Sequence, residues 1–288
     1  MSAAAIVLAL ASAFLFGLAL VLTQLGLRRV APLPAAAISI PASAFLFLAA
    51  APFVLAGIPV IWSVVPIFAA VGLLFPAVVT LLTFEANRVL GPVVTGALGN
   101  LAPLFAVALA FVLLGEPLTW LQLVGLVVTV AGVAILTPMR REQPKGWHAW
   151  YLLLPLAAAA LRGLVQPTVK LGLELWPSPF AAALIGYIVS AVALIVVARV
   201  RTGRYLSSAP TGSLAWFVAV GLCNGLAVLL MYAALANGRV ALVSPLVATY
   251  PLATVLFSAV LLGKLDSGIR LAIGAMVTVT GIVLLISG

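Results

Sequence analysis

The two halves of this sequence read nearly the same, and the charges at matching loop positions change sign between them. Matching segments recur about 146 to 149 residues apart: Gly17-Leu18 and Gly163-Leu164, Leu113-Leu114-Gly115-Glu116 and Leu261-Leu262-Gly263-Lys264, Gly125 and Gly274, and Gly132 and Gly281. Each copy holds five apolar segments, and an odd number leaves the second copy upside down in a membrane. Arg28 then matches Glu174, because basic residues are retained on the cytoplasmic side. Inverted repeats of this kind are typical of membrane transporters.

Composition excludes a soluble globule, because 66% of the 288 residues are hydrophobic and 7% are charged. We expect spans of roughly 18 to 25 residues, each able to cross a hydrocarbon core of about 30 Å, near residues 3–27, 35–56, 63–87, 92–115, 119–138, 148–173, 178–199, 213–236, 240–263 and 268–287. The prediction is an all-α membrane protein with ten transmembrane helices in two inverted five-helix repeats around a central cavity. The N-terminal repeat takes residues 1–138, a cytoplasmic linker 139–147 and the C-terminal repeat 148–288.

The net charge of +9 would suit a nucleic-acid partner, but the basic residues lie in short loops between spans. There they set the orientation of the chain, so we expect no nucleic-acid binding. The residues concerned include Arg28, Arg29, Arg140, Arg141, Lys145, Arg199, Arg201 and Arg204. With these loops in the cytoplasm, both termini face outward. Cys223 is the single cysteine, so neither a disulfide nor a thiolate metal site is expected.

Proline falls inside the fourth span of each copy, at Pro103 and Pro251, and inside the sixth span at Pro167. Each proline removes a backbone hydrogen bond and displaces the carbonyl four residues earlier. Within lipid a freed carbonyl is tolerated only against protein or a water-filled cavity. We therefore expect the fourth helices to bend around a central cavity. A packing kink without any ligand is the alternative.

The sequence offers little for chemistry on a covalent bond. The one histidine, His148, lies at a loop edge, and the only aspartate, Asp266, lies in the last loop. Neither paired histidines nor carboxylates inside the membrane are therefore available, and Lys170 has no serine at a neighbouring turn of its own span. We expect neither an enzyme nor a cofactor or metal site.

The sixth span carries Arg162, Gln166, Lys170 and Glu174 at steps of four, which places them along one slowly turning stripe of a helix. Arg162 lies about 20 Å from the cytoplasmic start of the span at 1.5 Å per residue. A charge at that depth costs on the order of 3 kcal/mol unless it faces a partner or water. We interpret the stripe as one wall of a cavity opening outward, with Arg162 near its floor. The alternative is an internal ion pair of Arg162 or a hydrogen bond from it to freed backbone carbonyls.

The other charged residues of the spans have closer candidate partners. Lys170 and Glu174 are expected to interact with each other near the outer surface, and Glu85 with Arg88 three residues away. Further candidate cavity residues are polar groups or aromatic walls that could equally serve helix packing: Asn100, Asn224, Thr80, Ser244, Tyr250, Phe84, Tyr187 and Tyr232.

These features resemble the EamA family of the drug/metabolite transporter superfamily, through the two five-span halves, Gly115-Glu116, and the stretch from Gly125 to Gly132 with its echo from Gly274 to Gly281. Within that family the chain is similar to the YddG-type exporters of aromatic amino acids and methyl viologen. The resemblance implies a basket of helices around a cavity and outward export of small metabolites across a bacterial inner membrane. The superfamily's small multidrug members rely on a glutamate in the first helix, where this chain has Phe14, Phe16 and Gln24.

The sequence thus predicts an inner-membrane exporter of small amphipathic metabolites, most of all aromatic or other bulky neutral amino acids, working by alternating access of the two repeats. The partners expected are a small-molecule substrate and the lipid bilayer, whereas the oligomeric state is open. A cationic drug exporter is the first alternative, disfavoured by a deep arginine without a deep carboxylate. A lipid-handling membrane protein or enzyme is the second.

Overall fold

The computed structural model describes residues 2–27, 30, 32–136, 148–202, 211–262 and 269–288, and every regular element in these ranges is a helix. The first half contains α1 (Ala3–Leu27), α2 (Pro32–Val54), α3 (Val65–Gly72), the π-helical η1 (Leu73–Val78), α4 (Val79–Gly99), α5 (Ala102–Leu114) and α6 (Trp120–Leu136). The second half contains the 3₁₀ turn η2 (Ala149–Leu152), α7 (Leu153–Leu175), α8 (Pro179–Thr202), α9 (Thr211–Asn237), α10 (Val240–Val247), α11 (Tyr250–Leu262) and α12 (Ile269–Ser287). The predicted linker lies outside the described residues.

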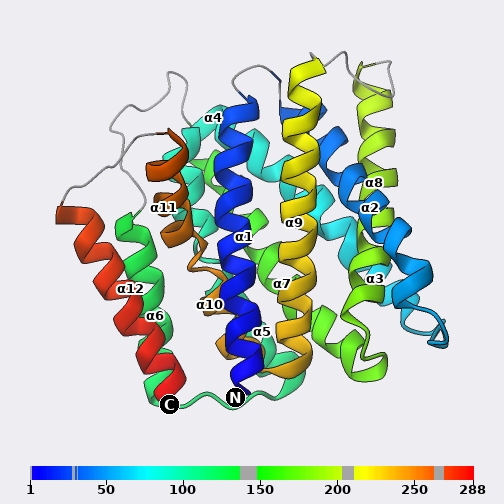
Figure 1. The fold of residues 1–288 in the computed structure, drawn as a ribbon. Coiled ribbons are helices and arrows are strands. Elements are labelled where there is room, and N and C mark those ends of the chain that lie inside the picture. The colour runs from blue at the N-terminus through cyan, green and yellow to red at the C-terminus, as the bar shows by residue number, and fades with distance from the viewer. Residues whose placement is uncertain (1, 28–29, 31, 137–147, 203–210, 263–268) are drawn as a thin grey trace.

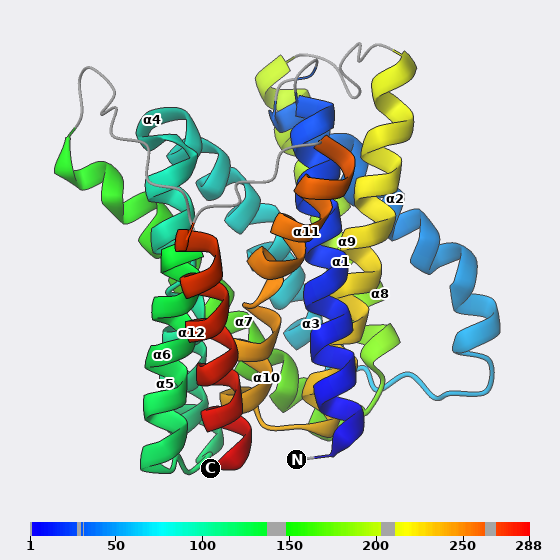
Figure 2. The ribbon, with the colours of Figure 1, turned by 60° about the vertical axis from the view of Figure 1, so that its left-hand side comes forward.

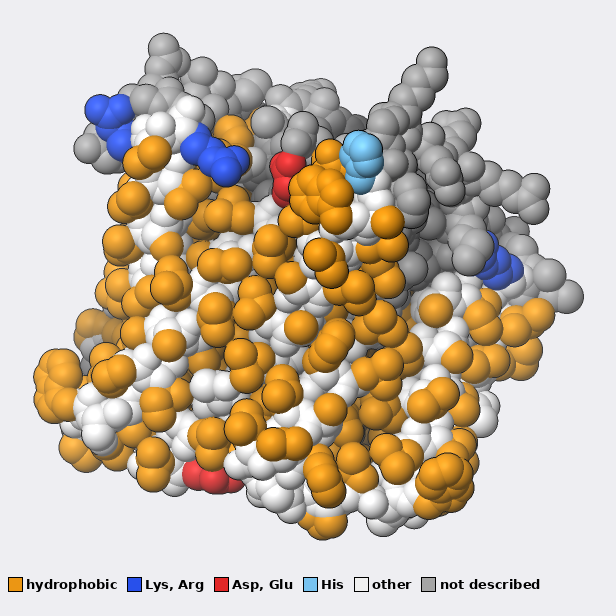
Figure 3. All heavy atoms as spheres, turned by 180° about the vertical axis from the view of Figure 1, so that it is seen from behind, with side chains coloured by type: hydrophobic (Ala, Val, Ile, Leu, Met, Phe, Trp, Pro, Cys, Tyr) orange, Lys and Arg blue, Asp and Glu red, His pale blue; other side chains and the backbone are white. Residues whose placement is uncertain are grey.

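The helices have the length and composition of membrane spans. In the described residues, 7 helices are long and apolar enough to cross a bilayer, and shorter apolar helices cover Ala102–Leu114, Trp120–Ile135 and Ala272–Ser287. Large apolar side chains face outward, with Phe53 84% and Trp120 79% exposed. Apolar side chains cover the flank seen in Figure 3, and the Lys and Arg side chains lie towards one end. This arrangement is that of a multi-pass membrane protein.

The two ends of the bundle differ. Figure 1 shows both chain termini at one end, which we call the terminal end. There the Ser2 hydroxyl donates to the Asn237 carbonyl at 3.1 Å. The opposite end, which we call the basic end, carries Arg199 and Arg201 in the last turn of α8.

The fourth span of each half is broken rather than bent. Residues 92–115 and 240–263 were each expected to form one kinked helix, but the chain leaves the helix at Asn100–Leu101 and again at Ala248–Thr249. Pro103 and Pro251 therefore lie in the first turn of new helices, α5 and α11. Proline is well tolerated there, because the first-turn N–H groups have no partner within the helix.

A second interruption lies in the third span. Phe75 has φ −139° and ψ 125°, an extended conformation within η1. The following residue is Pro76, and a residue before proline is pushed out of the helical region by the proline ring. Beyond this point α4 continues to Gly99, further than the predicted end of the span at residue 87.

The two halves interleave instead of forming separate bundles. In Figures 1 and 2, α1 lies against α9, and α6 against α12. The close approach of α1 to α11 depends on Gly17, because a Cβ there would lie 2.6 Å from Cβ of Ala253. Gly163 plays the matching role between α7 and α5, where a Cβ would lie 2.5 Å from Cβ of Phe105. In each case a glycine allows a helix of one half to pack closely against the second part of the broken helix of the other half.

Candidate functional site

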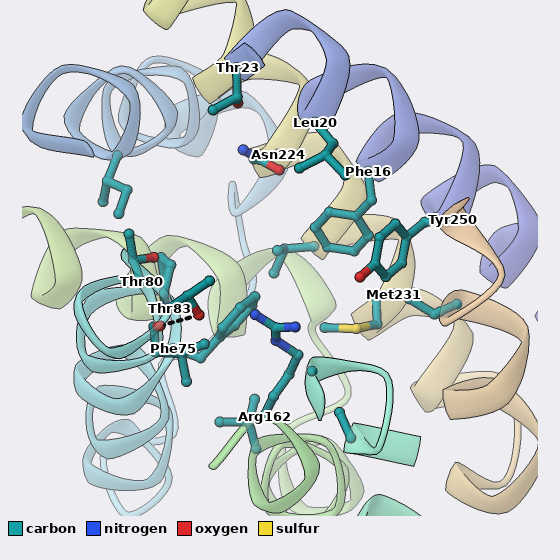
Figure 4. Close-up of a pocket in the computed structure, with 18 of the residues that line it drawn as sticks. Phe16, Leu20, Thr23, Phe75, Thr80, Thr83, Arg162, Asn224, Met231 and Tyr250 are labelled. Carbon is teal, nitrogen blue, oxygen red and sulfur yellow. Dashed lines mark hydrogen bonds between the residues drawn. The ribbon is translucent and has the colours of Figure 1, made fainter. Parts of the chain in front are cut away.

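A cavity of about 280 Å³ lies in the middle of the bundle and is lined from both halves of the chain (Figure 4). Its walls come from α1, α2, η1, α4, α7, α8, α9 and α10, from both helix breaks, and from the first residues of α5 and α11. Its size approaches the lower end of the range of small-molecule sites. The polar lining residues are Thr23, Ser39, Ser43, Thr80, Thr83, Asn100, Arg162, Gln166, Asn224, Ser244 and Tyr250.

The cavity extends from the middle of the bundle towards the basic end. Its lining residues on α1 are Phe16, Leu20 and Thr23, all in the half of α1 that is remote from the N-terminus. Ala35 lies near the start of α2 and Phe217 near the start of α9. The sequence prediction places the opening of the cavity on the side of the termini, whereas these lining residues lie towards the basic end.

Arg162 is the charged residue among the described cavity-lining residues. Its guanidinium points into the space between Phe75 and Tyr250 (Figure 4). A Cβ at Gly99 would lie 4.0 Å from Nη1 of Arg162, which places the guanidinium beside the break between α4 and α5. Within the described part of the chain, Arg162 has no hydrogen-bonding or ion-pair partner. Its donors are therefore available to a molecule in the cavity.

Two helix N-termini meet the same space. α5 begins at Ala102 and α11 at Tyr250, and both residues line the cavity. The second residue of each helix is a proline without an N–H, and the N–H groups of Leu104 and Leu252 already donate to Leu101 and Thr249, so these ends act mainly through the positive end of the helix dipole. Together with Arg162, they make this part of the cavity favourable for an anionic group. Tyr250 and Asn100 bring the two breaks together, with 3.5 Å between the Tyr250 hydroxyl and Oδ1 of Asn100.

The inner part of the cavity contains buried oxygen atoms without partners. Oε1 of Gln166 and the hydroxyl of Ser244 have no hydrogen bond in the described structure. Both residues line the cavity, and their exposed fractions are 5% and 1%. Because a buried polar atom without a partner is costly, such atoms favour a ligand that can donate hydrogen bonds.

Most predicted site residues reach the cavity: Arg162, Gln166, Asn100, Asn224, Thr80, Ser244, Tyr250, Tyr187 and Pro103 are among its lining. Tyr232 is different, because it is 2% exposed and packs in the apolar core without lining the cavity. The side chain of Phe84 lies outside the described residues. Pro251 is the second residue of α11, directly after the lining residue Tyr250, and α7 runs on through Pro167 without interruption.

Lys170 lies beyond the cavity and has a partner that differs from the predicted one. Its Nζ is 3.6 Å from Oε1 of Glu116 and donates to the carbonyl of Gly238 at 2.5 Å. Glu174 is exposed on the next turn of α7. The predicted Lys170–Glu174 pair is therefore wrong, because the fold brings a buried carboxylate from the other half to Lys170.

Sequence reasoning missed several apolar walls of the cavity, among them Phe75, Phe217 and Met231. In a chain this rich in apolar residues, nothing in their local pattern separates a cavity wall from a lipid-facing or core side chain. Phe75 becomes distinctive only through Pro76, which follows it and breaks the third span.

Comparison with known proteins agrees with this architecture. The profile of the EamA-like transporter family matches twice, at residues 3–137 and 149–287. A probable terminal-alkyne amino-acid exporter of Streptantibioticus cattleyicolor is 31% identical over 134 residues, covering 42% of this chain and 44% of that protein. The chain thus spans less than half the length of this relative. One protein of known crystal structure has a TM-score of 0.80 at 20% identity, covering 99% of this chain and 96% of its own.

Proposed function

Because the chain belongs to the EamA-like transporter family, we propose that it exports small amphipathic metabolites, above all aromatic or other bulky neutral amino acids. The observation that carries this proposal is Arg162, a cation without a described partner, directed into a central cavity (Figure 4). A half-buried cation beside two helix N-termini complements a carboxylate. Members of this family are transporters, so the cavity is interpreted as a transport site and not as a catalytic one.

The remaining groups of an amino acid also have complementary surfaces in the cavity. Oε1 of Gln166 and the Ser244 hydroxyl can accept hydrogen bonds from an α-ammonium group. The apolar walls include Phe16, Phe75 and Met231, which suit a bulky or aromatic side chain. The relative described as an amino-acid exporter supports the same class of substrate.

A cationic drug is a poorer fit to this cavity. The described lining residues include Arg162 and neither Asp nor Glu. A cation would meet a like charge without a compensating carboxylate, which disfavours its binding. A lipid-handling protein or enzyme is the remaining alternative from the sequence.

We propose that the two family copies form inverted five-helix repeats, making ten transmembrane segments in which the broken helices count once. α1 begins at the terminal end, because Ser2 contacts Asn237, whereas α7 ends there, because Lys170 contacts Gly238. Opposite directions for these two helices support the inversion. The basic end then faces the cytoplasm of a bacterial cell, and both termini face the periplasm. In this orientation the described conformation is open inward.

Alternating access would carry the substrate from the inner to the outer side. Because α1 packs on α9 and α5 packs on α7, each moving body would draw helices from both copies. This refines the expectation that one repeat rocks as a unit against the other.

Counter-flow in proteoliposomes tests the proposal. Vesicles loaded with unlabelled phenylalanine should transiently accumulate labelled phenylalanine or tryptophan. Vesicles loaded with an unlabelled, permanently cationic drug should not accumulate the labelled drug. Empty liposomes and liposomes with an unrelated membrane protein provide the controls. Exchange of the cationic drug without exchange of any neutral amino acid would overturn the proposal.

A further inference from the structure

A carboxylate is buried at the terminal end, outside the cavity. Glu116 is 7% exposed and lies between α5 and α6. Its Oε1 accepts the N–H of Val240 at 3.0 Å, and its Oε2 accepts the N–H of Ala241 at 3.1 Å. The side chain therefore caps the N-terminus of α10, where the helix dipole favours a negative charge.

Lys170 completes the cluster from α7. Its Nζ lies 3.6 Å from Oε1 of Glu116 and donates to the carbonyl of Gly238 at 2.5 Å. Glu116 belongs to the first family copy, whereas Lys170 and α10 belong to the second. We call these contacts of Glu116, Lys170, Gly238 and the start of α10 the terminal latch. It joins the two copies at the end where the cavity is closed.

The terminal latch is directly connected to the cavity through two helices. Lys170 lies one turn of α7 beyond the cavity-lining Gln166. α10 has 8 residues, all buried; Glu116 holds its first residues, whereas Ser244 and Val247 line the cavity. A shift of α10 would therefore move the cavity wall and the latch together.

We propose that the terminal latch is the gate of the terminal end, which must separate before the cavity can open to that side. A largely buried ion pair whose carboxylate also caps a helix is stable only while its partners stay in register. It therefore behaves as a two-state contact, favouring the conformation open to the basic end. This inference rests on the alternating access of the proposed function, but its test needs no substrate.

The experiment measures access to the cavity with one introduced thiol. Cys223 is first replaced by serine, and Val247→Cys then places a thiol on the cavity wall. A membrane-impermeant maleimide is applied separately to each side of sealed vesicles. In the otherwise unchanged chain, labelling should come from the basic end. Glu116→Gln and Lys170→Met should each raise the rate of labelling from the terminal end by about tenfold, a usual size for a conformational coupling.

Glu174→Gln is the matched control, because it removes an exposed carboxylate at the same end, one turn from Lys170. It should leave both labelling rates unchanged. Glu116→Gln combined with Lys170→Met should show less than the product of the single effects, because both break the same contact. Lys170→Met breaks the ion pair but leaves the Glu116 cap on α10 intact. This variant therefore tests the gate even if Glu116→Gln does not fold.

Unchanged access from the terminal end in a folded Lys170→Met protein would overturn the gate, even if its melting temperature falls. The terminal latch would then stabilise the fold without controlling access to the cavity. Because labelling is independent of substrate, that outcome leaves the export proposal standing. If the latch variants raise labelling from the terminal end as expected but counter-flow of amino acids fails, only the proposed substrate is wrong.

Discussion

The Tyr250 hydroxyl lies 3.5 Å from Oδ1 of Asn100, so the broken helices of the two halves meet across the cavity. This distance exceeds the usual 2.7–2.8 Å of an O–H···O hydrogen bond, and the contact is therefore weak. Tyr250→Phe should change the free energy of unfolding by less than about 0.5 kcal/mol. It should nevertheless weaken the apparent affinity for substrate, measured by counter-flow, because the hydroxyl is available to a ligand. A large loss of thermal stability would show instead that the contact holds the two halves together.

Ser244→Ala tests whether the inner end of the cavity is built for a ligand. The Ser244 hydroxyl is buried without a partner in the described structure, so its removal relieves a desolvation cost. The substrate-free variant should melt at the same or a slightly higher temperature than the unchanged protein. Saturating substrate should stabilise it less, because one acceptor for the substrate is gone. A lower melting temperature with unchanged ligand stabilisation would contradict this role.

Gly163→Ala should destabilise the protein by about 1–3 kcal/mol, a typical cost of overpacking. The new Cβ would lie 2.5 Å from Cβ of Phe105 and 2.8 Å from the backbone N of Ala106, at the start of α5. Gly186→Ala is the control, because its Cβ would meet Gly72 Cα at an ordinary 3.5 Å. Equal melting temperatures for the two variants would show that α5 can move away from α7 without cost.

Transport should proceed without an obligatory proton. The described lining residues carry neither Asp nor Glu, and Glu85 is not among them. No carboxylate in the described cavity wall can therefore alternate between ionised and neutral forms as the substrate passes. A pH gradient imposed on proteoliposomes should not drive uphill accumulation of amino acid. Accumulation that a protonophore abolishes would contradict this expectation and direct attention to the buried Glu116.

The sequence predicts the family, the all-helical membrane character and several polar residues of the cavity lining, because composition and repeat matching depend on the chain alone. Pro103 and Pro251 mark the middle of the fourth spans, but whether a proline bends or ends a helix depends on what satisfies the neighbouring backbone groups. Arg162 and Gln166 could be found because polar residues are rare in this chain and fall at helical spacing.

Contacts between the halves were beyond the reach of sequence. Lys170 and Glu174 are close along one helix, so their pairing was the natural expectation. In the structure the partner of Lys170 is Glu116, which belongs to the other half of the chain. Nζ of Lys170 lies 3.6 Å from Oε1 of Glu116. The echo of Leu113-Leu114-Gly115-Glu116 in the second half marks Glu116 as noteworthy. The repeat alone does not predict that the Glu116 carboxylate is buried and caps the N-terminus of α10.

The side to which the cavity opens was also undetermined by sequence. The stripe on α7 from Arg162 to Glu174 borders both the cavity and the region beyond it. Arg162 and Gln166 lie on the cavity side and Lys170 on the closed side. Residue spacing along one helix gives the face on which a stripe lies, but not the end of the bundle towards which a cavity extends.

In the proposed function Arg162 binds the carboxylate of an amino-acid substrate, and replacing this one residue isolates that contact. Transport by Arg162→Gln should be compared for phenylalanine and for the matching amine without a carboxylate, with Arg201→Gln at the exposed basic end as control. A charged hydrogen bond of about 1.5 to 3 kcal/mol predicts a loss of roughly tenfold to a hundredfold in affinity for phenylalanine.

Transport of the amine, whatever its initial rate, should fall much less, and the melting temperature of the substrate-free variant should stay near that of the unchanged protein. An equal loss for both compounds, together with a lowered melting temperature, would show that Arg162 is a structural residue and does not bind the substrate.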